Sequence, residues 1–197
     1  MEKKVYLITV IMLSTLQTAW SQKDYFPGYI VLNNRDTLYG EIQDRNINKV
    51  RLYEKIRFRS ASGKRMKLSA SDLISYSVNN KIFESKWFDE HANIFRFYYT
   101  HKIGTGEKTF LRLDTKGKVS VYTKEFTDGD CSTIDEFPLF LKEGDKYFQR
   151  ATQGVFGLKK KKLASYFQDC PKLVSEINQR SLKYAFEVAD YYNNKCE

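Results

Sequence analysis

The stretch LISYSVNNKIFESKWF (residues 73–88) decides the fold class, because it has the form of two β-strands around a two-residue turn. The strands are expected over 73–78 and 81–88, with Asn79-Asn80 between them. Asparagine tolerates positive φ better than most residues, so a tight hairpin turn fits there. The stretch therefore predicts an antiparallel β-hairpin.

The same organisation extends in both directions along the chain. Turn-forming clusters such as Asn34-Arg35-Asp36, Gly104-Thr105-Gly106 and Glu143-Gly144-Asp145 separate further expected strands. These strands cover residues 29–33, 37–43, 94–103, 108–113, 119–126, 137–142 and 146–151. With the basic segment described below, they predict an antiparallel meander of about ten strands, which must curl into a barrel or a sandwich to bury its apolar face.

Helical periodicity replaces the strand pattern after Gly154. Apolar residues then recur at helical spacing, and Asp169 followed by Pro171 predicts a helix start. Ser181 is the expected cap of a final helix. The sequence thus predicts an α+β fold in which two or three C-terminal helices (residues 154–197) cover an antiparallel β domain (residues 22–153).

The first residues have the form of a cleavable secretory signal. Lys3 and Lys4 precede an apolar run over residues 5–16, and Ala19-Trp20-Ser21 is the small-residue pattern that a signal peptidase recognises. The run is shorter than the roughly 20 apolar residues of a membrane span, which disfavours the alternative of an uncleaved anchor. We therefore expect residues 1–21 to be removed, and no transmembrane segment in the mature chain. The predicted location is the periplasm, the outer cell envelope or the medium.

An exported chain meets an oxidising environment in which cysteines can pair. The three cysteines, Cys131, Cys170 and Cys196, permit one disulfide. Cys170 opens one of the last two expected helices and Cys196 follows the other, so these two would meet in an antiparallel helical hairpin. Cys131 is a competing partner.

No catalytic or cofactor motif stands out. His91 and His101 lack carboxylates or cysteines at metal-ligand spacing, and Asp128-Gly129-Asp130 lacks the pattern of a calcium loop. We expect no metal and no cofactor. The chain is more simply a binding or scaffolding domain than an enzyme. A hydrolase acting on envelope or dietary polymer through paired carboxylates remains the alternative, because such carboxylates need only meet in space.

The most distinctive segment lies between residues 49 and 67. Its eight basic residues and single acid, Glu54, carry a net charge of +7, against +9 for the whole chain. In strand phase, Ile56 and Phe58 point one way and the cations the other. The candidate anion-binding residues are Lys49, Arg51, Tyr53, Lys55, Arg57, Arg59, Lys64, Arg65 and Lys67.

This segment has two interpretations. Charges on an edge strand keep a protein soluble and prevent sheet-to-sheet pairing. Alternatively, the cations bind an anionic envelope polymer, such as lipopolysaccharide or an acidic polysaccharide, or an acidic protein. Nucleic acid is not expected as a partner of an exported chain.

The opening of the expected mature chain also carries a resemblance. Residues 26–31 (FPGYIV), residues 36–42 (DTLYGEI) and the later YFQDCP (residues 166–171) resemble small uncharacterised exported proteins of Bacteroidetes-type Gram-negative bacteria. The resemblance implies a cell-envelope location and no particular activity.

The export signal gives a first prediction. Intact-mass measurement of the protein recovered from an expressing Gram-negative cell should give a chain that begins at Gln22. A recovered protein that retains residues 1–21 would contradict the cleavable signal.

Overall fold

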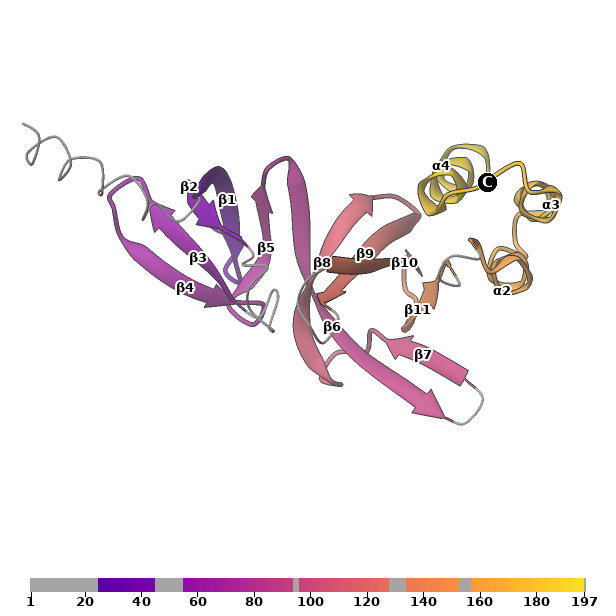
Figure 1. Cartoon of the computed structure of the whole chain (residues 1–197), viewed down its shortest axis with the longest axis horizontal. Helices are drawn as coiled ribbons and strands as arrows, with labels where there is room; N and C mark the ends of the chain where they lie inside the picture. The colour runs from indigo at the N-terminus through magenta and orange to yellow at the C-terminus, as the bar shows by residue number, and fades with distance from the viewer. Residues whose placement is uncertain (1–24, 45–54, 94–95, 128–133, 153–156, 197) are drawn as a thin grey trace, which may run out of the picture.

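A computed structural model (Figure 1) describes residues 25–44, 55–93, 96–127, 134–152 and 157–196. It confirms the predicted α+β class, with antiparallel strands followed by C-terminal helices. The first six strands are β1 (Phe26–Leu32), β2 (Thr37–Gln43), β3 (Lys55–Ser60), β4 (Arg65–Ser69), β5 (Leu73–Val78) and β6 (Lys81–Asn93). The next five are β7 (Arg96–Thr100), β8 (Glu107–Thr115), β9 (Val119–Thr127), β10 (Ile134–Lys142) and β11 (Tyr147–Arg150). The helices are α2 (Lys160–Tyr166), α3 (Pro171–Gln179) and α4 (Ala185–Lys195).

The molecule is elongated, with three parts in a row (Figure 1). Strands β1–β5 lie at one end and the helices at the other, with β6–β11 between them. The first five strands form a sheet in the order β4-β3-β2-β1-β5, and β5 then pairs with β6. The predicted turn between β5 and β6 is present, with φ of 51° at Asn79 and 59° at Asn80.

The N-terminal sheet packs against the outer side of the strands that follow. Its core contains Ile30, Ile42, Ile56, Phe58, Leu73 and Tyr76 together with Phe83 of β6 and Phe110 of β8. The Tyr76 ring stacks on Phe83 at 4.7 Å and meets Phe110 edge-on at 4.8 Å, measured between ring centroids. Offset-stacked and edge-to-face arrangements are the favourable geometries of aromatic pairs. This core therefore holds the first two parts together.

Two glycines allow the strands of this sheet to lie close together. Gly28 and Gly40 face each other across β1 and β2. A Cβ atom on Gly28 would lie 2.2 Å from the Ser77 carbonyl oxygen, and one on Gly40 would lie 2.3 Å from that of Arg59. Any larger residue at either position would push a neighbouring strand away.

Strand β6 is longer than predicted. The expected end at Phe88 is wrong, because pairing continues to Asn93. The first part of β6 pairs with β5 and β8, and the part from Asp89 onward pairs with β7. The polar run Asp89-Glu90-His91 interrupts the apolar alternation after Phe88, which is why the sequence placed the end of the strand too early.

Strands β6 to β11 close into a six-stranded barrel. The closed circuit runs β6-β7-β11-β10-β9-β8 and returns to β6. One apolar cluster draws on every strand of the circuit and is therefore the barrel interior; its members include Phe88, Tyr99, Leu111, Tyr122, Phe137, Leu139 and Phe148. Of the two predicted arrangements, barrel or sandwich, this part of the chain is a barrel.

The three helices cover β9 and β10 from outside. Val119, Val121 and Phe140 of these strands share a core with the apolar faces of the helices, among them Leu163 and Phe167. No helix of the described segments has the length and hydrophobicity to cross a membrane.

The predicted helix start is confirmed, because α3 begins at Pro171, but the expected capping residues are wrong in both helices. Cys170, not Asp169, occupies the N-cap of α3, and the Asp169 carboxylate accepts hydrogen bonds from Lys142 and Tyr192. Ser181 donates its hydroxyl to the Glu176 carbonyl at the end of α3, while α4 begins after Tyr184. In each case the side chain has found another partner.

A disulfide joins Cys170 and Cys196, whose Cα atoms lie 5.7 Å apart. It ties the start of α3 to the end of α4, the arrangement on which the expected pairing rested. Closing a loop of this size, with a sequence separation of 26, contributes about 3–4 kcal/mol in the chain-entropy model. Cys131 lies outside the described residues.

Polar contacts fix α4 against the edge of the barrel. The Asn193 side chain accepts a hydrogen bond from the Val119 N–H at 2.9 Å and donates one to the Val119 carbonyl at 3.0 Å. Lys118 adds a hydrogen bond from its ammonium group to the Cys196 carbonyl at 2.8 Å. Asn193 thus pairs with the start of β9 as a neighbouring strand would.

We expect Asn193→Ala to lower the free energy of unfolding by about 1–3 kcal/mol, because it leaves the buried backbone groups of Val119 without partners. Urea denaturation followed by circular dichroism measures the change. Asn194→Ala is the matched control, since that exposed side chain bonds to Asp190 on the same helix and its loss should cost under about 0.5 kcal/mol. Equal losses in the two variants would contradict the docking role of Asn193.

Candidate functional site: a basic β-ribbon

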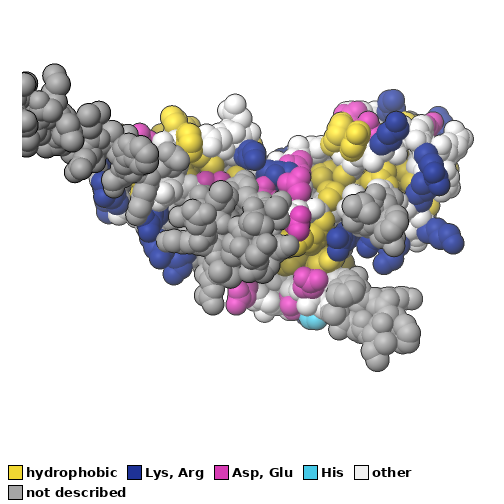
Figure 2. All heavy atoms as spheres, in the orientation of Figure 1, with side chains coloured by type: hydrophobic (Ala, Val, Ile, Leu, Met, Phe, Trp, Pro, Cys, Tyr) yellow, Lys and Arg dark blue, Asp and Glu magenta, His cyan; other side chains and the backbone are white. Residues whose placement is uncertain are grey.

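Strands β3 and β4 place six of the predicted cations on the N-terminal sheet. Ile56 and Phe58 of β3 are fully buried, so the alternating residues of this strand face away from the core. The six cations are Lys55, Arg57 and Arg59 on β3, Lys64 in the turn, and Arg65 and Lys67 on β4. We call this set the basic ribbon. Figure 2 shows Lys and Arg side chains along this side of the N-terminal sheet.

The strand register brings like charges face to face. Arg57 lies opposite Lys67, and Arg59 lies opposite Arg65. Directly opposed residues share a face of the sheet, where residues two apart on one strand are about 7 Å apart and neighbouring strands about 4.8 Å apart. The ribbon is therefore a grid of cations. Like charges in such positions are destabilising unless something else compensates them.

One ribbon residue has its own counter-charge. The Arg59 guanidinium donates from Nε to Glu41 at 2.6 Å and lies 4.8 Å from the centre of the Tyr25 ring. Neither Glu41 nor Tyr25 was among the predicted site residues. Glu41 faces Arg59 across β2 and β3, a relation that only the strand register reveals.

The other ribbon cations are less compensated. Lys55 lies near Asp72, whose pKa is lowered first by hydrogen bonds from Ser69 and also by the Lys55 charge. Arg57, Arg65 and Lys67 form no ion pair with any other described residue. With Lys64 of the turn, which also has no ion pair to a described residue, these are the ribbon cations without a counter-charge in the described part of the chain.

Some predicted residues cannot be placed on this surface. Lys49, Arg51 and Tyr53 lie outside the described residues. The sequence has a second basic cluster, four consecutive lysines at residues 159–162, which lies at the start of α2 at the opposite end of the molecule (Figure 1). The structure therefore keeps the two basic clusters apart.

Three carboxylates of the described residues surround one arginine. Arg112 contacts Asp114 at 2.7 Å, Glu125 at 2.5 Å and Glu136 at 2.9 Å. Burial alone would lower the pKa of Arg112, but the hydrogen bonds to Asp114 and Glu136 outweigh it and raise that pKa. The guanidinium thus stays charged, and all three acids are engaged by it.

The histidines serve packing. His91 pairs with Asp89 at 2.8 Å and stacks on the Tyr98 ring at 4.9 Å. His101 packs against Phe148, and burial lowers its pKa. In the described part of the chain, no three His, Cys, Asp or Glu side chains are placed so that they could hold a metal ion.

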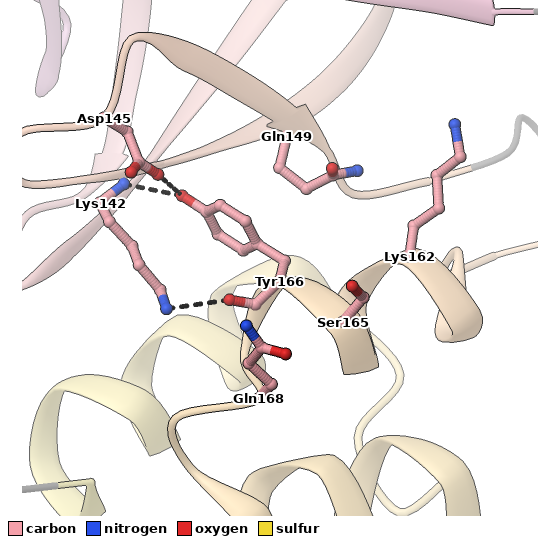
Figure 3. A pocket seen from close by; sticks show the side chains of 7 residues that line it. All are labelled: Lys142, Asp145, Gln149, Lys162, Ser165, Tyr166 and Gln168. Atoms are coloured by element: carbon pink, nitrogen blue, oxygen red, sulfur yellow. Dashed lines mark hydrogen bonds between the residues drawn. The ribbon is translucent and has the colours of Figure 1, made fainter.

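A hollow of about 450 Å³ lies between the β10–β11 turn and α2 (Figure 3). The Tyr166 hydroxyl donates to Asp145 at 2.6 Å and accepts the backbone N–H of Lys142 at 2.8 Å. The Lys142 ammonium group donates to the Tyr166 carbonyl at 2.9 Å. These polar groups bind one another and dock α2 to the barrel, so the hollow belongs to the helix interface.

No family model, no curated protein and no solved structure gives a significant match to this chain.

The opposed charges of the ribbon lead to a stability prediction. Lys67→Glu should raise the free energy of unfolding by about 0.2–1 kcal/mol, because it places a carboxylate opposite Arg57. The gain should shrink at high salt, where exposed charges are screened. Lys81→Glu makes the same charge change opposite Val78 and should give no comparable gain. Urea denaturation at two salt concentrations measures the free energy of unfolding of both variants. If the Lys67 variant is no more stable than the Lys81 variant, the inferred repulsion between Arg57 and Lys67 is contradicted.

Proposed function

We propose that this chain is an exported, non-enzymatic binding protein of the cell envelope, and that the basic ribbon binds an anionic polymer. The secretory signal predicted for residues 1–21 supports the location. The grid of cations on β3 and β4 supports the ligand class.

The observation that carries the proposal is the position of β3 in the sheet. Charges on an edge strand are explained by the need to prevent sheet-to-sheet pairing, which accounts for Arg65 and Lys67 on β4. Strand β3 is not an edge, because it pairs with β2 on one side and β4 on the other. Edge protection therefore gives no reason for Lys55, Arg57 and Arg59.

The chemistry of the ribbon favours carboxylate or phosphate groups repeated along a chain. Arginine binds two oxygens of such a group with its planar fork, which lysine cannot do. The spacing of roughly 5–7 Å between neighbouring positions lets several cations contact one extended polymer. An acidic polysaccharide or the phosphorylated part of lipopolysaccharide has this character, and the proposed export disfavours nucleic acid.

The hydrolase alternative gains no support from the carboxylates described above. Asp114, Glu125 and Glu136 all contact Arg112, which leaves them poorly suited to exchange protons with a substrate. We therefore retain the binding function as the proposal.

The proposal predicts that Arg57→Gln/Arg65→Gln/Lys67→Gln weakens binding to polygalacturonate by about tenfold. Three exposed charge contacts of about 0.5 kcal/mol each correspond to that factor. Wild-type affinity should also fall steeply with added salt. Isothermal titration calorimetry at several salt concentrations measures both effects, with neutral dextran as the uncharged polymer.

A matched variant separates the ribbon from net charge. Lys161→Gln/Lys172→Gln/Lys183→Gln removes the same charge from exposed positions on and beside the helices and should retain nearly full affinity. Equal loss in the two triple variants would mean that only overall charge matters. If the folded ribbon variant binds polygalacturonate as well as wild type does, the ribbon cations serve only to keep the protein soluble.

A further inference from the structure

A larger cavity, of about 830 Å³, lies at one end of the barrel. Three turns line it: the β7–β8 turn with residues 101–103, the β8–β9 turn with residues 116–117, and the β10–β11 turn with residues 143–146. Strand residues Lys86, Ser120, Tyr122, Leu141 and Lys142 complete the lining. Its volume falls within the range of small-molecule sites, roughly 300–1,000 Å³.

Each of these turns contributes one exposed lysine. Lys102, Lys116 and Lys146 come from three separate turns and converge on the same cavity. None of the three forms an ion pair with another described residue. The charge of Lys116 also acts on nearby Glu84. Cations that converge on a concavity attract anions, because the low-dielectric walls focus the field.

The two remaining lysines of the lining are held in place. The Lys86 ammonium lies 2.8 Å from Glu84, which also accepts the Tyr122 hydroxyl at 2.7 Å. The Lys142 ammonium lies 2.8 Å from Asp169 and over three aromatic rings, those of Tyr166, Phe167 and Tyr192. These two cations belong to the wall, so the turn lysines are the ones free to bind.

The carboxylates of the lining do not cancel this charge. Because Lys86 and Lys142 are paired with Glu84 and Asp169, the balance lies between the three turn lysines and two acids of the lining, Glu143 and Asp145, which leaves an excess of one positive charge. Asp145 already accepts the Tyr166 hydroxyl at 2.6 Å. Burial keeps the pKa of His101 below its ordinary value, so this residue lines the cavity as a neutral ring at neutral pH.

The cavity also has an apolar side. Ile103 stands on its rim with 82 % of its surface exposed, the highest value among the large hydrophobic residues described. Tyr122 and Leu141 form the adjoining wall. An isoleucine this exposed, beside lysines at the mouth of a cavity, provides apolar contact for a bound molecule.

We propose that this barrel-mouth cavity binds a small amphiphilic anion, with a carboxylate, sulfonate or phosphate head on an apolar ring or chain. The head group contacts Lys102, Lys116 and Lys146, and the apolar body lies against Ile103, Tyr122 and Leu141. This site is separate from the basic ribbon, which lies on the N-terminal sheet, and it stands independently of the function proposed for that ribbon.

The test uses three probes against the full chain, with two-dimensional amide NMR to give both affinity and location. Naphthalene-2-sulfonate has both the anionic head group and the apolar body. 2-Naphthol has only the apolar body, and methanesulfonate has only the anionic head group. The sulfonate should bind with a Kd below about 1 mM and shift the amides of the three turns. Each partial probe should bind at least about tenfold more weakly.

Variants then assign the binding to the named groups. Lys102→Gln/Lys146→Gln, at two exposed positions, should weaken naphthalene-2-sulfonate binding by about tenfold, and Ile103→Ser should weaken it by a similar factor. The ribbon variant Arg57→Gln/Arg65→Gln/Lys67→Gln is the matched control and should bind this probe like wild type. Thermal unfolding checks that each variant is folded.

Three results would overturn the proposal: no saturable binding of the sulfonate, shifts confined to residues outside the three turns, or undiminished binding by the folded Lys102/Lys146 variant. Because the ribbon is tested with a polymer and this cavity with a small probe, failure at one site leaves the other unaffected.

Discussion

The architecture depends on β6, a strand of 13 residues that belongs to two β-structures at once. Successive side chains of a strand lie on opposite faces, so Phe83 enters the core of the N-terminal sheet while Phe88 enters the barrel. A slip of one residue in its register would exchange the two faces. Glu84 and Lys86 would then enter the apolar core of the sheet, so the pattern on this strand fixes both halves of the β-structure together.

Buried and exposed charged side chains differ in whether they need a partner of opposite charge. Leaving a buried charge without its partner costs several kcal/mol, whereas an exposed ion pair contributes about 1 kcal/mol or less. Accordingly, Glu84 meets both Lys86 and Tyr122, and Arg112 meets three carboxylates. The cations of the basic ribbon and of the three barrel-mouth turns lie on the sheet surface and on exposed turns. Their repulsion costs the fold little, and they remain available to ligands.

Local chemistry predicted much of the fold. The positive φ values of Asn79 and Asn80 and the alternation of buried and outward residues on β3 follow from neighbouring residues alone. The pairings of β1 with β5, β6 with β8 and β7 with β11 join strands that do not follow one another in the chain. No local signal marks such pairings, since they depend on how the sheet curls and closes.

The two cationic surfaces also differ in how much of each could be predicted from the sequence. The six ribbon cations lie within 13 residues of one hairpin, and the period-two pattern of a strand was enough to place the five on β3 and β4 on one face. The opposition of Arg57 to Lys67 needed the strand register, and the pairing of Arg59 with Glu41 needed the neighbouring strand. Lys102, Lys116 and Lys146 are ordinary turn lysines in the sequence, far apart along the chain. Only the closure of the barrel brings their three turns together at one end. The alternation of apolar and polar residues determines which face of a strand a residue occupies, whereas tertiary packing determines which residues of other strands lie beside it.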